Sequence, residues 1–182
     1  MRLWCQDETR VGLHLPVGRR ISARGIKPIR VTAPVYQDYW RYAAVQPACG
    51  ATFWLELPAL DTPCFPVFLE RFGAHDPQSF HILVLDNAPA HIARAVAPPA
   101  NVVLVNLPPY CPELNPVERL WQRLKRYLTD RVTTRFTLDT LRQTVDHFIQ
   151  TITTQQLASL TNLPYLQKIG CDLFKGISLI HR

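Results

Sequence analysis

Two short and continuously apolar segments in the middle of the chain most restrict the folds that it can adopt. Residues 81–85 (HILVL) and 102–107 have the length and the composition of strands that are buried on both faces. Apolar residues at helical spacing over residues 65–72 precede the first segment, and a short segment over residues 91–97 separates the two. This order predicts parallel strands that are covered by helices, and therefore an α/β fold.

The first third of the chain has a different pattern. Leu3 to Gln6 and Val11 to Leu15 predict two strands joined by a tight connection. The basic segment 16–28 has two glycines among turn-forming residues and predicts an exposed, mobile loop. Further segments rich in β-branched or aromatic residues predict a meander of antiparallel strands at Ile29 to Tyr36, Trp40 to Val45 and Ala51 to Leu57.

Two amphipathic helices are predicted in the last third of the chain, where apolar residues recur at helical spacing after a proline-rich loop. The face of the first helix has Val117, Leu120, Trp121, Leu124, Tyr127 and Leu128. The face of the second has Leu138, Leu141, Val145, Phe148, Ile149 and Ile152. A short helix is predicted near Gln155 to Leu160, and the rest of residues 153–182 has no clear period.

The composition indicates one globular domain with an anionic partner. The chain has 182 residues, of which 47% are hydrophobic and 19% charged, so that a sizeable core can be buried, and its net charge is +6. No apolar stretch approaches the roughly 18 residues of a membrane-spanning helix, and the N-terminus has no signal-peptide core. The five cysteines are widely spaced, without a C-x-x-C pair. We therefore expect a cytoplasmic protein with reduced thiols and no membrane partner.

Asp86 directly follows the apolar segment 81–85 and precedes Asn87-Ala88-Pro89. Its side chain is therefore expected at the carboxyl end of a strand, where ligands approach open α/β sheets. An Asx-turn or a helix cap explains the same residue about as well. Both interpretations stay open.

Glu118 lies in the first turn of the first amphipathic helix, after Asn115 and Pro116. This is the arrangement of a capping box, in which Asn115 caps the helix and Glu118 reaches back to it. The helical angle also puts Glu118 at the boundary of the apolar face, where a metal ligand can point. Neither interpretation excludes the other.

Asp7 follows the first apolar segment and precedes a second acid, Glu8. If the apolar residues of that segment face the core, strand alternation puts Asp7 on their side and Glu8 on the opposite one.

Convergence of Asp7, Asp86 and Glu118 would be costly without a cation, because adjacent carboxylates repel. Such oxygen ligands suit Mg²⁺ or Mn²⁺, and two ions about 4 Å apart would serve the cleavage of a phosphodiester. Without metal, Asp86→Asn is expected to leave the fold as stable or more stable.

The chain resembles the DDE transposases of the mariner superfamily, in particular bacterial insertion-sequence members, in three segments: WCQDETRVGL, HILVLDNAPAH and VVLVNLPPYCPELNPVERLWQRLK. The resemblance covers residues 3–128, and LPPYCPELNPVE is its most specific part. It implies a ribonuclease-H-like fold, with a mixed five-stranded sheet and helices on both faces. The implied catalytic domain is residues 1–152, and residues 153–182 are a C-terminal tail.

The resemblance also implies that Asp7, Asp86 and Glu118 are the catalytic acids and the ligands of Mg²⁺ or Mn²⁺, with two ions expected. The implied reaction is metal-dependent hydrolysis of DNA at the element ends, followed by attack of the freed 3′-hydroxyl on target DNA. Asn87, His91 and Asn115 are expected near the active site. A lone histidine is more often a structural group, however, and Asn87 is expected to support the turn rather than to contact metal.

Contacts to DNA phosphates are expected from two groups of cations, although a solvated charged face explains such groups as well. The group in the basic loop is Arg19, Arg20, Arg24, Lys27 and Arg30. The group on the first amphipathic helix is Arg119, Arg123, Lys125 and Arg126.

The chain departs from the family pattern in two ways. Thirty-one residues separate Asp86 from Glu118, which suggests a shortened loop around Pro98-Pro99. Family members carry helix-turn-helix domains before the first acid, whereas six residues precede Asp7 here. We therefore expect a helix-turn-helix region that is separately encoded or joined by frameshifting. The other expected partners are double-stranded DNA, which the resemblance implies, and a second copy of the chain.

Two other functions stay open. A structure-selective nuclease of the same fold would cut DNA without strand transfer. A catalytically inactive remnant of a transposase would only bind DNA. The presence of all three acids argues against decay of the site, but it does not exclude loss of function through truncation.

Overall fold

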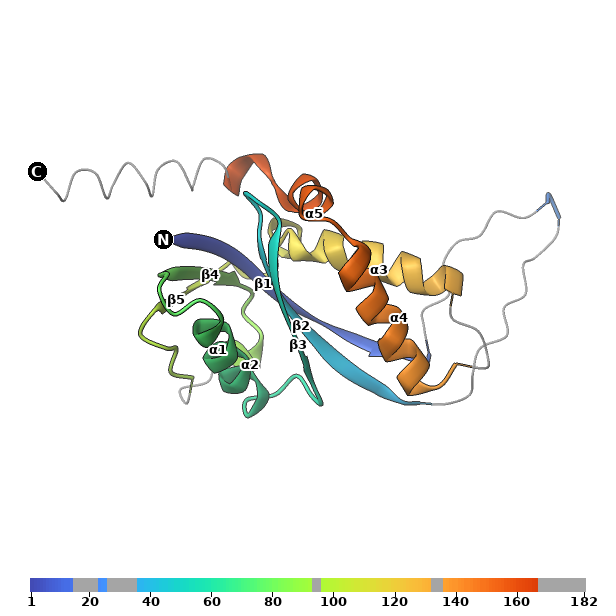
Figure 1. Ribbon diagram of the computed structural model, residues 1–182, viewed down its shortest axis with the longest axis horizontal. Coiled ribbons are helices and arrows are strands. Elements are labelled where there is room, and N and C mark those ends of the chain that lie inside the picture. The colour runs from blue at the N-terminus through green and yellow to red at the C-terminus, as the bar shows by residue number, and fades with distance from the viewer. Residues whose placement is uncertain (15–22, 26–35, 93–95, 132–135, 167–182) are drawn as a thin grey trace, which may run out of the picture.

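The computed structural model describes residues 1–14, 23–25, 36–92, 96–131 and 136–166. Within these residues five strands form one sheet in the order β3-β2-β1-β4-β5 (Figure 1). The strands are β1 (Arg2–Gly12), β2 (Asp38–Gln46), β3 (Ala51–Leu57), β4 (His81–Leu85) and β5 (Val102–Asn106). The pairs β1–β2 and β2–β3 are antiparallel, while β1–β4 and β4–β5 are parallel. The predicted mixed five-stranded sheet is confirmed.

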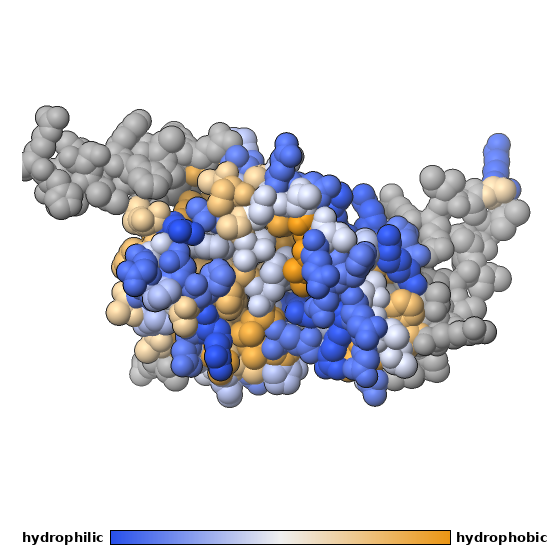
Figure 2. All heavy atoms as spheres, viewed as in Figure 1, coloured by the Kyte–Doolittle hydropathy of each residue, from blue (hydrophilic) through white to orange (hydrophobic). Residues whose placement is uncertain are grey.

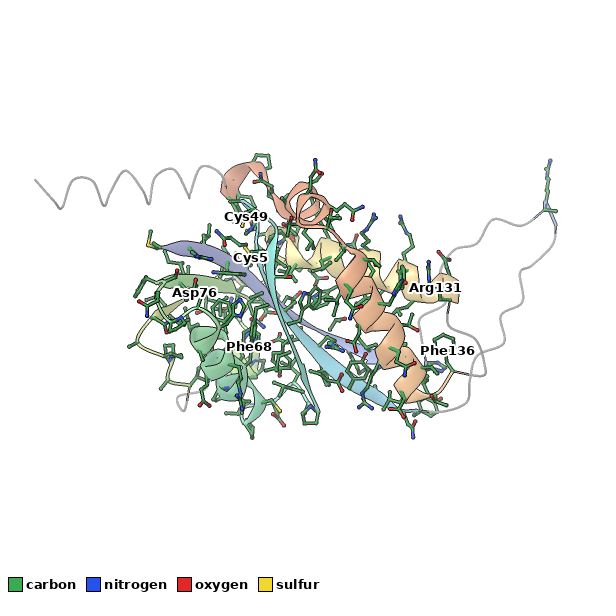
Figure 3. All side chains as sticks on the ribbon, in the orientation of Figure 1. Cys5, Cys49, Phe68, Asp76, Arg131 and Phe136 are labelled. Atoms are coloured by element: carbon green, nitrogen blue, oxygen red, sulfur yellow. The ribbon has the colours of Figure 1, made fainter. Side chains whose placement is uncertain are left out.

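Helices cover both faces of this sheet, as predicted (Figure 1). They are α1 (Cys64–His75), α2 (Pro89–Ile92), α3 (Val117–Arg131), α4 (Leu138–Thr151) and α5 (Thr154–Thr161), with a 3₁₀ turn at Pro112–Leu114 before α3. Trp4 and Phe68 belong to the core on the α1 side, whereas Cys5 and Trp121 belong to the core on the side of α3, α4 and α5. Phe68 and Cys5 are labelled in Figure 3. Neighbouring residues of β1 thus enter different cores.

β1 is one continuous strand of 11 residues, so the prediction of two strands joined by a tight connection is wrong. Asp7 is 8% exposed, and the side chain of Glu8 is 3% exposed. Adjacent acids usually indicate a turn, but here each acid has a hydrogen-bond partner on its own face of the sheet. The strand can therefore continue through both residues.

The helical faces predicted for the last third of the chain are confirmed. In α3 the residues Val117, Leu120, Trp121, Leu124 and Leu128 are buried, while Tyr127 is half-buried. On the side of the molecule seen in Figure 2, hydrophilic residues predominate over α3 and α4. Helix α4 begins with a capping box between Thr137 and Thr140.

The segment after residue 152 begins with α5, which lies where a short helix is predicted. Leu157 and Leu163 are buried in the same core as α3. Gly50, at a φ of +72°, lies against the backbone of Thr154 so closely that any Cβ atom would collide with it. The first part of the segment 153–182 therefore packs onto the sheet, while the domain boundary at residue 152 stays a prediction.

Some predicted features fall on residues that the structure does not describe. The predicted strand at 29–36 and the predicted loop at 16–28 lie outside the described residues, except for residues 23–25 and 36. Among the described helices, none is long and apolar enough to cross a membrane. The four described cysteines are free thiols.

Candidate active site

The parallel pairing of β1 with β4 brings Asp7 and Asp86 together. Its last pair joins Cys5 to Val84. Continued by two residues, this register sets Asp7 beside Asp86, which follows the end of β4. β1 thus runs past the carboxyl end of its parallel neighbour, where ligands approach open α/β sheets.

Asn115 attaches the start of α3 to β1, next to Asp7. Its Nδ2 donates to the backbone oxygen of Gln6 at 2.8 Å, and its Oδ1 accepts from the N–H of Val117 at 3.2 Å. The predicted capping role of Asn115 is confirmed by the second bond. Among the hydrogen bonds of the described residues, none runs from the Glu118 side chain back to Asn115, so the predicted capping box lacks that half.

A pocket of about 370 Å³ lies between these elements. It is lined by Asp7, Asp86, Glu118, Asn87, Asn115 and residues 107–112. Residues from β1, from the end of β4 and from α3 therefore line one cavity. All three acids predicted from the sequence are among them, while their chemical roles stay predictions.

Asp7 is a buried carboxylate that accepts two hydrogen bonds. Its Oδ1 accepts from the backbone N–H of Glu8 at 2.9 Å, and its Oδ2 accepts from Nε1 of Trp121 at 3.0 Å. Burial raises the pKa of Asp7 well above its ordinary value, and the charges of Glu8 and Glu118 raise this pKa further. The ionised form of Asp7 is thus destabilised in the folded protein.

The surroundings of Asp86 have the opposite effect and favour its ionised form. Its half-exposed side chain accepts at Oδ1 from the N–H of Ala88 at 2.9 Å. Nδ1 of His91 lies 2.8 Å from the same Oδ1, as an ion pair, and 3.3 Å from the backbone oxygen of Asp86. The hydrogen bond from His91 lowers the pKa of Asp86, because it outweighs the effect of partial burial. The contact with Ala88 is the Asx-turn that one interpretation predicts, and it coexists with a place in the pocket.

These surroundings change what we expect of Asp86→Asn, whose stability stays a prediction. That substitution would remove a favourable ion pair with His91, so it should destabilise the metal-free fold. The charge of Asp86 also raises the pKa of Asp7, but it is the smallest of the causes, so relief of this repulsion should offset only part of the lost ion pair.

Side-chain amides tie the loop after β4 to the end of β5. Asn87 donates from Nδ2 to the backbone oxygen of Leu107 at 2.6 Å, and Asn106 donates from Nδ2 to the backbone oxygen of Asp86 at 3.1 Å. The backbone N–H of Leu107 donates to the oxygen of Leu85 at 2.8 Å. Asn87 therefore supports the turn, as expected, and also lines the pocket.

His91 connects Asp86 to Glu8 on the α1 side of the sheet. Its Nδ1 faces Asp86 Oδ1, and its Nε2 lies 2.9 Å from Glu8 Oε1. Burial alone would lower the pKa of His91, but the hydrogen bonds to Asp86 and Glu8 outweigh it and raise this pKa to about 10. These hydrogen bonds therefore favour the protonated form of the His91 ring.

The sequence predicted that His91 lies near the site, but it did not predict that Glu8 contacts His91. Strand alternation correctly puts Glu8 on the face opposite Asp7. That face is itself covered by helix α1, so Glu8 is buried instead of solvated. Periodicity in the local sequence carries no signal for the contact between residues 8 and 91.

The chemistry of the pocket suits a hard divalent cation, because carboxylate and amide oxygens line it. A cation would also relieve the unfavourable charge on buried Asp7. Among the described residues, however, no three His, Cys, Asp or Glu side chains lie close enough together to hold one ion. The three acids are near enough to influence the pKa of Asp7 but do not form a closed set of ligands.

The predicted phosphate-binding cations are described only in part. The members of the loop group that lie outside the described residues are Arg19, Arg20, Lys27 and Arg30, whereas Arg24 is described and exposed. The exposed members on α3 are Arg119, Arg123, Lys125 and Arg126. Within the described part of the chain, none of the four α3 cations forms an ion pair with a carboxylate.

Two of these cations, Arg123 and Arg126, line a second groove of about 360 Å³ between α3, α4 and α5. Arg131, at the end of α3 (Figure 3), also lines it and stacks its guanidinium over the ring of Tyr127 at 3.7 Å. The groove shares no lining residue with the acidic pocket. Arg131 is not among the cations that the sequence predicts to contact phosphates, although it lies at the basic end of the same helix.

Comparisons with known proteins agree with this geometry. The model of the DDE superfamily endonuclease family matches residues 2–142. Uncharacterized protein y4pE/y4sA of Sinorhizobium fredii (strain NBRC 101917 / NGR234) is 37% identical over 97 residues, which cover 51% of this chain and 72% of that protein.

Solved structures of Mos1 transposase share the fold. The Mos1 paired-end complex with left transposon end matches with a TM-score of 0.67 and 16% identity, over 88% of this chain and 51% of that chain. The catalytic domain of Mos1 mariner transposase matches with a TM-score of 0.61 and 16% identity, over 88% of this chain and 76% of that chain. Our chain thus spans about half the length of the Mos1 chain in the complex.

The expected ribonuclease-H-like fold is confirmed by this likeness. The family match covers more than three quarters of the chain, and it includes β1, β4 and α3 with Asp7, Asp86 and Glu118. The chain belongs to the DDE superfamily endonucleases.

Proposed function

We propose that the chain is the catalytic domain of a mariner-superfamily transposase, which cuts DNA at the ends of a mobile element and joins the freed 3′-hydroxyl to target DNA. The observation that carries this proposal is the pocket that Asp7, Asp86 and Glu118 line at the carboxyl end of β4. Membership of the DDE superfamily endonucleases and the fold shared with the Mos1 catalytic domain support it.

The surroundings of the three acids suggest different contributions to the site. Asp7 is held by Trp121 and by the backbone of Glu8, so its carboxylate has a fixed orientation. Asp86 is held at Oδ1, and among the described residues nothing donates a hydrogen bond to its Oδ2. The Glu118 side chain, in the first turn of α3, forms no hydrogen bond or ion pair within the described residues.

We propose these three carboxylates as ligands of Mg²⁺ or Mn²⁺, with two ions expected. Mos1 mariner paired-end complexes have been solved with Mn and with Mg. The bound metal would supply Lewis-acid activation of the attacking oxygen and stabilisation of the leaving oxygen. The protein contributes the fixed orientation of Asp7 and Asp86 and a pocket wall tied together by Asn87.

Double-stranded DNA is the proposed partner, both as element ends and as target. The net charge of +6 and the exposed cations of α3 support it, because DNA binding neutralises phosphates with Lys and Arg. One Mos1 complex contains a left transposon end. The homodimer, the helix-turn-helix partner and the cytoplasmic location expected from the sequence remain parts of this proposal.

Two assays with the purified chain test the proposal. Plasmid nicking measures strand cleavage, and joining of an oligonucleotide with a free 3′-hydroxyl to the plasmid measures strand transfer. We expect both activities with Mn²⁺ or Mg²⁺, their loss in Asp7→Asn, Asp86→Asn and Glu118→Gln, and wild-type activity in the exposed control Glu113→Gln. Nicking without joining would favour the nuclease, and a folded wild type that does neither would favour the inactive remnant.

A further inference from the structure

We propose that Glu8 and His91 are positioning residues for Asp86, acting from beneath the pocket as a buried, hydrogen-bonded carboxylate–imidazole pair. This inference rests on the proposed function, because it assigns to the pair the task of orienting a metal-binding carboxylate. Neither residue lines the acidic pocket, whereas Asp86 does. The pair would therefore act through Asp86, without touching substrate or metal.

The geometry of the imidazole ring carries the inference. Nδ1 lies 2.8 Å from Asp86 Oδ1 and 3.3 Å from the backbone oxygen of Asp86, and Nε2 lies 2.9 Å from Glu8 Oε1. Carboxylate and carbonyl oxygens accept hydrogen bonds, so each ring nitrogen can donate to the acidic residue that it faces. One imidazole ring thus bridges two acids that belong to different strands or strand ends, far apart in the chain.

Packing prevents the ring from moving away from this position. The His91 side chain is 1% exposed, and its ring lies 4.3 Å from the ring of Phe65 on α1, measured between centroids. Glu8 is also held, because Gln6 donates from Nε2 to Glu8 Oε1 at 2.6 Å. Water has little access to the contact between His91 and Glu8, so this bond is stronger than it would be at the surface.

The contacts with His91 and Ala88 fix the orientation of the Asp86 carboxylate. Oδ1 is occupied by His91 and by the N–H of Ala88, so the half-exposed side chain has two restraints on one oxygen. Oδ2 is then the oxygen available for a ligand in the pocket. Metal-binding carboxylates and histidines in proteins are commonly oriented by such outer hydrogen bonds.

Adjacent acids of β1 would therefore serve the site from both faces of the sheet. Asp7 lines the pocket directly and is held by Trp121 of α3. Glu8 reaches the pocket indirectly, through His91 and then Asp86. This gives Glu8 a task on the α1 side, where the polar side chains of Gln6 and His81 are buried as well.

A purely structural ion pair is the alternative, and metal affinity separates the two. Calorimetric titration with Mn²⁺ would compare the wild type with Glu8→Gln, His91→Phe, the double variant and Asp86→Asn. The matched control is Glu56→Gln, since Glu56 also forms ion pairs, with Arg41 and Arg142, but does not line the pocket. Glu8→Gln preserves size and an acceptor oxygen, so it keeps the test valid if His91→Phe fails to fold.

We expect Glu8→Gln and His91→Phe each to weaken Mn²⁺ binding by about tenfold to a hundredfold, as is usual for outer-shell substitutions. The double variant should bind no more weakly than His91→Phe, because Glu8 acts through His91. In DNA nicking, the same variants should lower kcat with little change in KM for DNA. Glu56→Gln should match the wild type in both measurements.

Two results would overturn the inference in distinguishable ways. If Asp86→Asn weakens Mn²⁺ binding while folded Glu8→Gln and His91→Phe bind as the wild type does, the positioning role is wrong and the proposed metal site stands. If the wild type does not bind Mn²⁺, or binds it as Asp86→Asn does, the proposed metal site fails, and the positioning role fails with it.

Discussion

Trp121 of α3 donates a hydrogen bond from Nε1 to Oδ2 of Asp7 in the middle of β1, across 114 positions of sequence. The indole is buried, and it also packs edge-on against Trp54 with ring centroids 5.7 Å apart. The same residue thus attaches the helix that carries Glu118 to the sheet and orients one acid of the pocket. A substitution of Trp121 would therefore affect both the packing of α3 on the sheet and the orientation of Asp7.

Substitutions at Trp121 should separate these two contributions. Trp121→Ala should lower the free energy of unfolding by about 3–5 kcal/mol, since it leaves a large cavity in the core. Trp121→Phe should cost less, about 1–3 kcal/mol, because it retains much of the packing but loses the donor to Asp7. Chemical denaturation measures both values, and a loss below about 1 kcal/mol for Trp121→Ala would show that the indole does not anchor α3.

The stability of the metal-free protein should depend on pH through Asp7. The pKa of Asp7 is raised in the folded state, so the folded protein binds a proton more tightly than the unfolded chain. Acidification from neutral pH should therefore stabilise the fold, from the raised pKa down to the unfolded value of about 3.9. Asp7→Asn should melt at a higher temperature than the wild type at pH 7, and this difference should shrink as the pH falls. A difference that is constant with pH would contradict the raised pKa.

Divalent metal should stabilise the wild type, and Asp86→Asn should remove most of this effect. At a Mn²⁺ concentration about a hundred times Kd, the gain is roughly 2.7 kcal/mol, or roughly 5–10 °C in Tm for a domain of this size. Without metal, Asp86→Asn should melt below the wild type, because the lowered pKa of Asp86 stabilises the fold at all pH values above its unfolded pKa. Melting curves with and without Mn²⁺ measure both effects. Equal shifts in the wild type, Asp86→Asn and Glu113→Gln would refute the acidic site.

The cations of the α3 groove should contribute to DNA affinity without sequence preference. Arg123→Ala combined with Arg126→Ala should weaken binding to duplex DNA and reduce the slope of log K against log salt by about 1 for each phosphate that the variant no longer neutralises. The control is Arg142→Ala, because Arg142 is already paired with Glu56 and Asp139. Fluorescence anisotropy at several salt concentrations gives the slopes. An unchanged slope in the double variant would show that the groove does not bind phosphates.

Local pattern was sufficient for much of the fold. The apolar run before Asp86 predicted β4 and the place of that acid, and the spacing around Trp121 predicted the buried face of α3. Local pattern failed at Asp7 and Glu8, where two adjacent acids suggested a break in β1. The rule that charges mark turns applies to solvated side chains, whereas both of these acids are buried with partners.

The sequence by itself determined the α/β class, the phase of the helices and the identity of the three candidate acids, because periodicity and short motifs depend on residues close together in the chain. Tertiary structure decided how those acids differ. The register of β1 on β4 sets Asp7 beside Asp86, α3 adds Trp121 on one face, and α1 encloses Glu8 and His91 on the other. The hydrogen bonds that Glu8 and Asp7 accept from His91 and Trp121 join residues 83 and 114 positions apart, so burial and charge at the site arise only once the chain has folded.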